Sequence, residues 1–195
     1  MTHQILYIPG FGGERDANIQ IKALKKWQKL DVEVHFMPID WADGEPFESK
    51  LERTIKQIEE LYGRYGKISL VGVSAGASLA INAYVEMRDA VSGVVFICGK
   101  LRNPEGVNER YFAGHPAFRK SVFAGGANVE NLTKQDKAKM LTLRSLFDGL
   151  IPAHDSRIPG VKKKFIPMVT HAPTIFLAIT IYKRIAVNFL KRRAE

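Results

Sequence analysis

Short apolar runs alternate along the chain with longer stretches in which apolar residues recur at every third or fourth position. The continuous runs are typical of strands that are buried on both faces of a parallel sheet. The longer stretches are typical of helices that bury one side. The runs that predict strands cover residues 5–9, 32–37, 68–71, 92–98, 140–147 and 161–169. The stretches that predict helices cover residues 14–30, 46–64, 75–88 and 173–193.

This alternation predicts an α/β fold in which about six strands form a mostly parallel sheet with helices on both faces. Pro167 lies in the last expected strand and has no N–H to donate, so that strand is expected at an edge of the sheet. Pro173 is well placed in the first turn of the last helix. Residues 99–138 contain Gly, Pro and Asn without a clear period and are expected to be less regular.

The length and composition are those of a globular protein. The chain has 195 residues, of which 46% are hydrophobic and 25% are charged, so there is enough apolar material for a core and global disorder is excluded. A single domain over residues 1–195 is expected. Cys98 is the only cysteine in the sequence, which excludes a disulfide scaffold.

The apolar runs are too short to predict a membrane span or a secretion signal. The run at residues 5–9 lacks a basic region before it and is shorter than a signal-peptide core. The best membrane candidate, residues 175–190, is interrupted by Lys183 and Arg184, and no run reaches the roughly 18 apolar residues of a spanning helix. The expectation is a soluble, cytoplasmic protein.

The positive charge is concentrated near the C-terminus. The net charge is +9, and residues 157–195 hold nine basic residues and one acidic residue. Such a region is typical of a solvated face, and also of contact with nucleic acid or an anionic membrane. The sequence has no zinc-finger, RNP or convincing helix-turn-helix pattern, so no nucleic-acid partner is expected. Weak contact of residues 162–164 and 191–193 with anionic lipid, or with an acidic substrate, remains open.

Residues 72–76 read G-V-S-A-G and lie between an expected strand and an expected helix. A serine on such a sharp turn is presented as a nucleophile, and the crowded turn requires small residues two positions before and after it. The start of the helix adds a positive dipole and free N–H groups. The pattern therefore predicts that Ser74 is a nucleophile; the alternative is a glycine-rich turn with an idle serine.

A serine needs a base, and the base needs an acid that orients it. His171 directly follows the last strand, at the edge where the carboxyl ends of the strands meet, and is the expected base; His154 is the second choice. Asp148 follows the strand at 140–147 and is the expected acid, with Asp155 and Asp40 as alternatives. An aspartate at this position can also serve only as a turn residue.

Acyl transfer further requires donors for the developing oxyanion, and two backbone N–H groups suffice. Ala75 follows the nucleophile and would supply one of them. The glycine-rich loop at residues 9–13 follows the first strand and would supply the other, from the N–H of Phe11. The same loop could cradle a phosphate, but neither G-x-G-x-x-G nor a Lys-Ser/Thr pair is present.

Together, the G-V-S-A-G turn, the order Ser74, Asp148, His171, and the D-G-L-I-P run at residues 148–152 resemble the α/β-hydrolase family. The resemblance covers nearly the whole chain and matches its six strands to the third to eighth strands of the family. It implies a minimal hydrolase similar in size to the small lipases without a cap. Many members have His-Gly after the first of these strands, where this chain has Pro9 and Gly10.

The function expected from these features is that of a serine hydrolase acting on an ester or related acyl bond of a small molecule, with no metal and no organic cofactor. The alternatives are a non-catalytic binding protein of the same fold and an interfacial lipase that its basic C-terminal region steers to anionic membranes. Residues 100–138 are expected to form at most a small lid. The candidates for a wall of the acyl pocket, which could equally pack against the sheet, are Tyr111, Phe112, Phe118, Val122 and Phe123.

Overall fold

The computed structural model describes residues 2–106 and 109–194 and contains a six-stranded sheet in the order β2-β1-β3-β4-β5-β6. Every neighbouring pair of strands is parallel. The strands are β1 (His3–Ile8), β2 (Val32–Phe36), β3 (Ile68–Val73), β4 (Val91–Ile97), β5 (Met140–Ser145) and β6 (Lys162–Ile166). The expected strands and the position of the last strand at an edge are therefore confirmed.

The helices between and after these strands cover both faces of the sheet, as expected. They are α1 (Glu14–Lys25), α2 (Phe47–Tyr65), α3 (Gly76–Glu86), α4 (Glu109–Gly114), α5 (Pro116–Glu130), α6 (Lys134–Ala138), α7 (His171–Ile179) and α8 (Lys183–Ala194). Short 3-10 helices, η1 (Lys26–Leu30) and η2 (Pro104–Gly106), complete the described elements.

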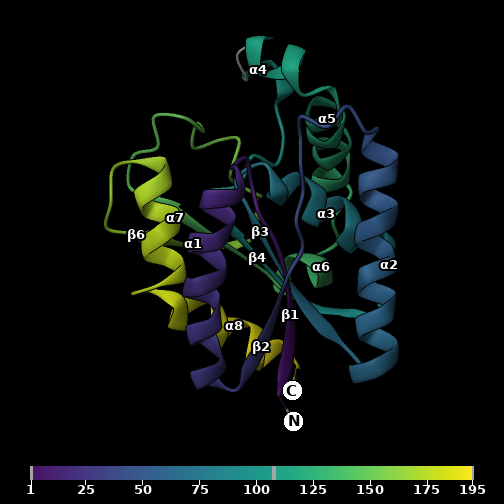
Figure 1. The fold of residues 1–195 in the computed structure, drawn as a ribbon, viewed down its shortest axis with the longest axis vertical. Coiled ribbons are helices and arrows are strands. Elements are labelled where there is room, and N and C mark those ends of the chain that lie inside the picture. The colour runs from purple at the N-terminus through teal and green to yellow at the C-terminus, as the bar shows by residue number, and fades with distance from the viewer. Residues whose placement is uncertain (1, 107–108, 195) are drawn as a thin grey trace.

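Two apolar cores lie on opposite faces of the sheet. Helices α1, α7 and α8 cover one face, and α2, α3 and α5 cover the other (Figure 1). Strand residues alternate between the two cores, so that Leu6 and Ile8 point into one and Ile5 and Tyr7 into the other. Because both faces are covered, β1, β3 and β4 are almost entirely buried, which is why their apolar residues appear in the sequence as continuous runs.

The expectation that residues 99–138 are irregular is wrong for most of this segment. Helix α5 packs along α3, where Ser78 Oγ lies 2.8 Å from Ser121 Oγ and Asn82 donates a hydrogen bond to the Ser121 carbonyl. A Cβ atom at Gly125 would lie 3.0 Å from the Leu101 carbonyl oxygen. The helix–helix contact thus uses Ser, Asn and Gly, which are poor helix formers and obscure the apolar period.

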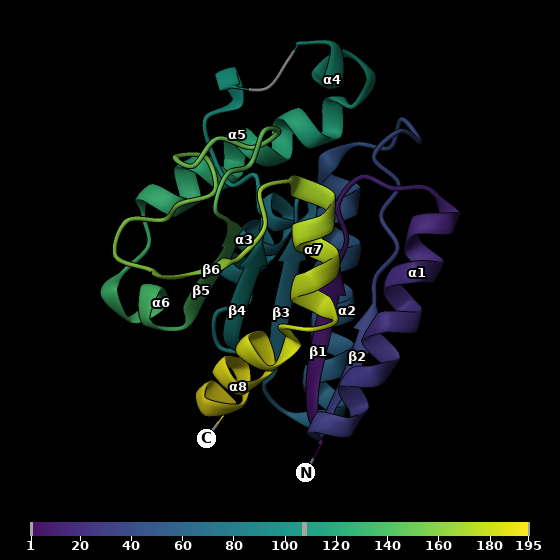
Figure 2. The same cartoon turned by 90° about the vertical axis from the view of Figure 1, so that its left-hand side faces the viewer.

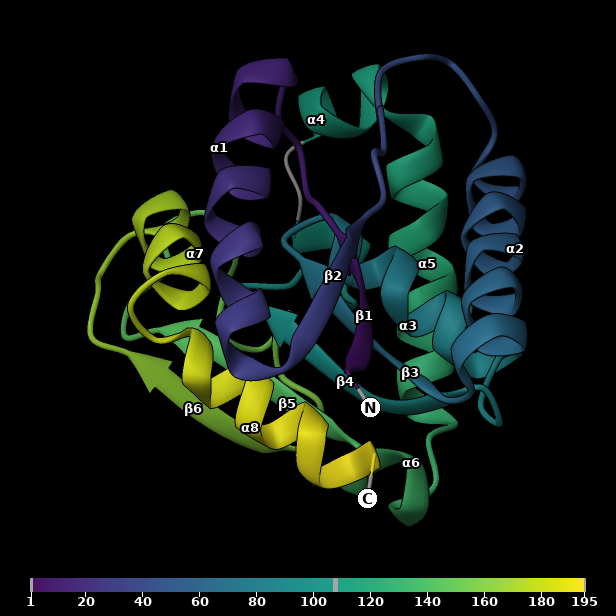
Figure 3. The ribbon, with the colours of Figure 1, turned by 60° about the horizontal axis from the view of Figure 1, so that its bottom comes forward.

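The single helix expected at residues 173–193 is also wrong. It is divided into α7 and α8, whose axes are bent by 59° at the break (Figure 2). No single helix among the described residues is long and apolar enough to cross a membrane; only the bent pair reaches that length and composition. Ala178, Ile179, Val187 and Leu190 of this pair are buried in the core on the sheet. The bend lets both helices follow that face, where α8 contacts β4 and β3. Figure 3 shows α7 and α8 on the same side of the sheet.

The topology brings distant loops together at one end of the sheet. From β1 the chain moves to one side to form β2 and then crosses to the other side of β1 to form β3. The carboxyl ends of β1 and β3 therefore flank a topological switch point, where parallel sheets place their ligand sites. The two chain ends lie at the opposite end of the molecule (Figure 1).

Candidate active site

Ser74 lies on the sharp turn between β3 and α3, and its backbone is strained. Its φ of 50° is in the left-handed region, which residues with a side chain rarely adopt. A Cβ atom at Gly72 would lie 2.7 Å from Ala80 Cβ, and one at Gly76 would lie 2.3 Å from the Pro9 carbonyl oxygen. Both positions of the turn must therefore be glycine, and the turn projects the Ser74 side chain from the carboxyl end of the sheet.

The loop after β1 passes directly over Ser74. A Cβ atom at Gly10 would lie 2.6 Å from Ser74 Cβ and 3.2 Å from its Oγ. The next residue, Phe11, has its ring centroid 4.9 Å from that of Phe118 and 4.6 Å from that of His115. The loop is thus held against the serine by a glycine on one side and by aromatic contacts with α5 and its N-terminal end on the other.

His171 joins Ser74 to Asp148 in one line of hydrogen bonds. His171 Nε2 lies 2.9 Å from Ser74 Oγ, and His171 Nδ1 lies 2.8 Å from Asp148 Oδ2. The imidazole and the carboxylate are nearly buried. Three residues that are distant in the sequence are therefore in contact, in the arrangement that the strand ends predict.

Hydrogen bonds keep the Asp148 carboxylate ionised. Burial alone would raise its pKa, but the bonds from His171 and from the backbone N–H groups of Ile151 and Leu150 lower the pKa below the ordinary aspartate value. An ionised carboxylate can only accept, so the proton of the Asp148–His171 bond lies on Nδ1. Nε2 is then the acceptor that faces the Ser74 hydroxyl.

The loops that carry Asp148 and His171 are bound to each other. The Leu146 N–H donates to the Met168 carbonyl at 2.9 Å, two residues before Asp148 and three before His171. His171 is also the first residue of α7 and follows the N-cap residue Thr170. The start of a helix and a backbone bond between loops therefore fix the positions of the two side chains.

The alternative site residues lie elsewhere. His154 is exposed, and its Nε2 lies 3.1 Å from Asp155. Asp155 is fully buried and paired with Lys100 Nζ at 2.5 Å. The Asp40 carboxylate accepts the N–H of Ala42 at 2.8 Å in an exposed turn. Among the described residues, none of these three forms a hydrogen bond or an ion pair with Ser74.

Lys100 is a residue of the site region that the sequence analysis missed. Its backbone N–H donates to the Ser74 carbonyl at 3.0 Å, while its ammonium group bonds to Asp155 and to the Asn103 carbonyl. The loop after β4 is thus held beside the serine turn by a backbone hydrogen bond, and a buried ion pair joins the same loop to Asp155. Lys100 and Asp155 are 55 positions apart, and no local pattern in the sequence signals their pairing.

A cavity of about 350 Å³ opens at Ser74 between α1 and α7. Its walls near the serine are Gly10, Phe11 and His171. Its apolar walls are Ile19, Leu150, Ile175, Phe176 and Ile179. Asp16 and Gln20 are its polar side chains away from the serine. The cavity is therefore suited to an apolar group that extends from a carbonyl at Ser74.

Of the residues proposed for an acyl-pocket wall, the four whose side chains the structure describes do not line this cavity. Phe112, Phe118 and Val122 are buried in the core on the other face of the sheet, so they pack against the sheet. The Phe123 side chain is about half exposed. The Tyr111 side chain lies outside the described residues. The small lid at residues 100–138 stays a prediction, although α5 within it is a covering helix.

Cys98, Asp148 and His171 have possible metal-ligand atoms within 4.8 Å of one another. Burial, reinforced by the charge of Asp148, raises the pKa of the Cys98 thiol to about 12. A metal binds the thiolate form, which this environment opposes. Asp148 and His171 are hydrogen-bonded to each other, and His171 is also hydrogen-bonded to Ser74. The cluster is therefore better suited to proton transfer than to a metal.

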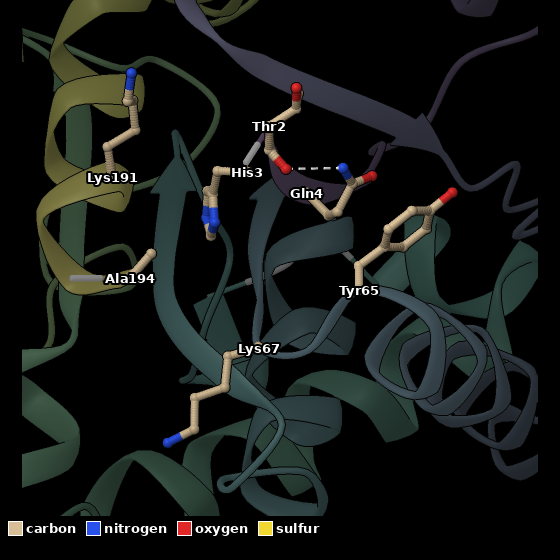
Figure 4. A pocket seen from close by; sticks show the side chains of 7 residues that line it. All are labelled: Thr2, His3, Gln4, Tyr65, Lys67, Lys191 and Ala194. Carbon is tan, nitrogen blue, oxygen red and sulfur yellow. Dashed lines mark hydrogen bonds between the residues drawn. The ribbon is translucent and has the colours of Figure 1, made fainter.

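A second cavity, of about 480 Å³, lies at the amino ends of the strands (Figure 4). It is lined by Thr2, His3, Gln4, Tyr65, Lys67, Lys191 and Ala194. His3 is bonded to Ser69 Oγ at 2.8 Å, and burial lowers its pKa. Ser69 is fully buried and is not among the described residues that line this cavity, so it is not presented to a ligand there. The cavity also lies at the opposite end of the strands from Ser74.

Comparison with known proteins gives structural relatives. No family model matches the chain, and no curated protein matches its sequence. A carboxylesterase structure from the thaumarchaeon Nitrososphaera gargenis aligns with a TM-score of 0.73 at 12% identity, over 99% of this chain and 91% of that chain. A structure from the metagenome-derived lipolytic enzymes LipS and LipT aligns with a TM-score of 0.71 at 13% identity, over 96% and 91%. An esterase from Thermogutta terrifontis, bound to malate, aligns with a TM-score of 0.60 at 18% identity, over 98% and 90%.

These alignments extend over nearly the whole length of each chain. The six-stranded parallel sheet and its covering helices are the α/β-hydrolase fold, as the sequence resemblance implies. The fold supports many activities, so the function must be argued from the site.

Proposed function

We propose that this protein is a serine hydrolase that cleaves carboxylic esters or related acyl bonds. The observation that carries the proposal is the line of hydrogen bonds from Ser74 through His171 to Asp148, with distances of 2.9 and 2.8 Å. A serine, a base and an orienting acid within hydrogen-bond distance form the arrangement that activates a hydroxyl. The strained backbone at Ser74 is a second observation in its favour.

In this mechanism Ser74 Oγ attacks the substrate carbonyl carbon while its proton moves to His171 Nε2. The carbonyl π electrons move to the oxygen, and the N–H groups of Phe11 and Ala75 stabilise the oxyanion. The tetrahedral intermediate then collapses and expels the alcohol, which takes the proton from His171. Asp148 stabilises the imidazolium between these transfers.

Water completes the cycle by the same route. His171 accepts a proton from water, the hydroxide attacks the acyl carbon, and collapse of the second intermediate returns the proton to Ser74 Oγ as the carboxylic acid leaves. These steps use only side chains and backbone groups of this chain and need no metal or organic cofactor.

The apolar walls of the cavity between α1 and α7 favour a substrate with an apolar acyl group of short to medium length. A cavity of about 350 Å³ is at the small end of the range for ligand pockets. The substrate is therefore an ester or thioester of such an acid.

The test is steady-state hydrolysis of p-nitrophenyl esters whose acyl chains increase from acetate to laurate. We expect kcat/KM to rise with chain length, because each buried methylene adds about 0.8 kcal/mol, and then to fall when the chain exceeds the cavity. No hydrolysis above the Ser74→Ala background at any chain length would contradict the proposal and favour a binding protein of the same fold.

A lipid–water interface is the second candidate setting for the same chemistry. Phe147, Val169 and Phe176 lie close in sequence to Asp148 and His171, and their side chains are 70%, 58% and 49% exposed. Exposed apolar residues near a site are typical of a surface that meets lipid. Activity on tributyrin that rises sharply above its solubility would favour an interfacial lipase, and a continuous saturation curve would favour an esterase.

A further inference from the structure

A cavity of about 560 Å³ beside the edge strand β6 has a strongly basic lining. Its charged side chains are those of Arg102, Arg144, Arg157 and Lys163, which we call the basic pocket. Among the described residues, no acidic residue lines it, and none of its lining residues lines the cavity at Ser74. Neither catalysis nor the sheet accounts for four cations around one cavity.

The position of Arg144 in the basic pocket is the least expected, because it is largely buried. It belongs to β5, and only 9% of its surface is exposed. Within residues 2–106 and 109–194, no carboxylate lies within ion-pair distance of Arg144, Arg157 or Lys163. Because Arg144 is largely buried, its guanidinium is partly desolvated, and no pairing with a carboxylate offsets that cost.

The register of β5 and β6 places Lys163 near Arg144. Arg144 pairs with Phe165 and Thr142 pairs with Lys163, so Arg144, Lys163 and Phe165 share one face of the sheet. The Arg144 guanidinium lies 6.0 Å and the Lys163 ammonium 5.9 Å from the centroid of the Phe165 ring. The aromatic face attracts both cations, but their mutual repulsion remains.

A buried acid beside the pocket does not neutralise these cations. Asp155 follows His154, a lining residue of the pocket, but its Oδ2 accepts from Lys100 and its Oδ1 from Asn103. Lysines on an edge strand also discourage pairing with other chains, which is a sufficient reason for Lys162 and Lys164. That reason does not extend to Arg144, which is buried, or to Arg157, which lies on a loop.

We propose that the basic pocket binds a small molecule that carries a phosphate group. Guanidinium groups match the oxygens of phosphate in two-point hydrogen bonds, and several cations around one cavity favour a dianion over a single carboxylate. Because Arg144 is largely buried, a small soluble ligand can reach it more readily than a flat membrane surface can. The site is separate from the cavity at Ser74, so the proposal stands independently of the proposed function.

The test is calorimetric titration of the full chain with pyrophosphate at about 0.15 M ionic strength, where unspecific surface attraction is largely screened. We expect binding of one pyrophosphate per chain. Lys163→Gln and Arg157→Gln each remove one exposed cation of the pocket, and each is expected to weaken binding about tenfold, as for the loss of one charge-assisted hydrogen bond. Arg144→Met is expected to abolish measurable binding.

Lys164→Gln is the matched control. It makes the same change in charge one residue away, on the opposite face of β6, and is expected to bind pyrophosphate as the unaltered chain does. Because Lys163 and Arg157 are exposed, their variants remain informative even if Arg144→Met fails to fold. Equal weakening by Lys163→Gln and Lys164→Gln would overturn the proposal, as would the absence of binding at about millimolar pyrophosphate. Binding to phosphatidylglycerol vesicles without binding to pyrophosphate would also overturn it.

Discussion

At Ser74 a left-handed backbone, the start of α3 and the loop after β1 meet within a few ångströms. A non-glycine residue in this conformation costs of the order of 1–3 kcal/mol, which the surrounding contacts must offset. Gly10 lies so near Ser74 that a Cβ atom on it would have no room. The geometry at the nucleophile therefore depends on a residue that takes no part in proton transfer.

Gly10→Ala tests this dependence. Its Cβ would lie 2.6 Å from Ser74 Cβ, so the loop that carries the Phe11 N–H must move away. We expect kcat to fall about 10²–10³-fold, as for the loss of one oxyanion donor. Gly13→Ala is the matched control, because a Cβ there meets nothing within 4 Å, and its kcat should be unchanged. Equal effects of the two substitutions on kcat for p-nitrophenyl butyrate would refute the proposed role of this loop.

Asp148→Asn tests the orienting acid. An amide in place of the carboxylate removes the charge that keeps the proton on His171 Nδ1, so kcat should fall about 10³–10⁴-fold while the thermal midpoint changes little. Asp40→Asn, at the rejected alternative, should retain full activity because its carboxylate only accepts the Ala42 N–H. If Asp40→Asn were the inactive variant, the assignment of the acid would be wrong.

The sequence predicts the neighbourhood of Ser74, Asp148 and His171 because each follows a strand at the same edge of a parallel sheet. Their catalytic roles stay a prediction. The parts that could not be predicted are contacts between distant positions: Lys100 with Asp155, and Gly10 with Ser74. Such contacts depend on the paths of the loops, which the spacing of apolar residues along the chain does not indicate.

At the scale of elements, α7 both presents His171 and forms a wall of the cavity, so one helix couples the base to acyl-chain selection.

Ile175→Trp is expected to fill part of the cavity. It should lower kcat/KM for octanoate esters at least about tenfold while leaving acetate esters within about twofold. Ile181→Trp, on an exposed position beyond α7, should change neither. Uniform losses for all esters would show that the cavity does not hold the acyl chain.

Two predictions about helices are wrong, and each error has a physical cause. Helix α5 is obscured because small and polar residues form its contact with α3. The break between α7 and α8 is missed because the apolar pattern continues across it; only the path of the sheet face requires the bend. Periodicity reports which residues are buried, and it does not report the direction of the helix axis.

At the scale of the whole molecule, acid should weaken the fold through carboxylates with depressed pKa values. Burial alone would raise the pKa of Asp136, but hydrogen bonds from Tyr84 and Thr133 lower it below the ordinary value. A depressed pKa stabilises the folded state above the unfolded-state pKa of about 4, and this stability is lost as the pH falls through the folded-state pKa.

Asp136→Asn should therefore lower the free energy of unfolding by about 1–2 kcal/mol at pH 7. The difference from the unaltered chain should shrink below about pH 4, as measured by urea unfolding across pH. Asp89→Asn, on an exposed position, should have little effect at any pH. A difference for Asp136→Asn that stays constant down to pH 3 would exclude this linkage.

The sequence predicts which segments form the strands of the sheet, but it does not predict the order of the strands within the sheet. Every strand that the apolar runs predict is present, and the edge position of β6 agrees with Pro167 directly after it. The order β2-β1-β3-β4-β5-β6 arises from how helices cross the two faces, which local patterns do not specify. Function depends on that order, because it places the loop after β1 beside the serine turn after β3.

The central claim is that Ser74 is an activated nucleophile, and covalent labelling with a fluorophosphonate probe tests it most directly. The folded chain and its Ser74→Ala variant would be treated in parallel and the adduct located by peptide mass. The account predicts one adduct, on Ser74, and none on the variant. A folded chain that remains unlabelled, or labelling at another residue that persists in Ser74→Ala, would contradict it.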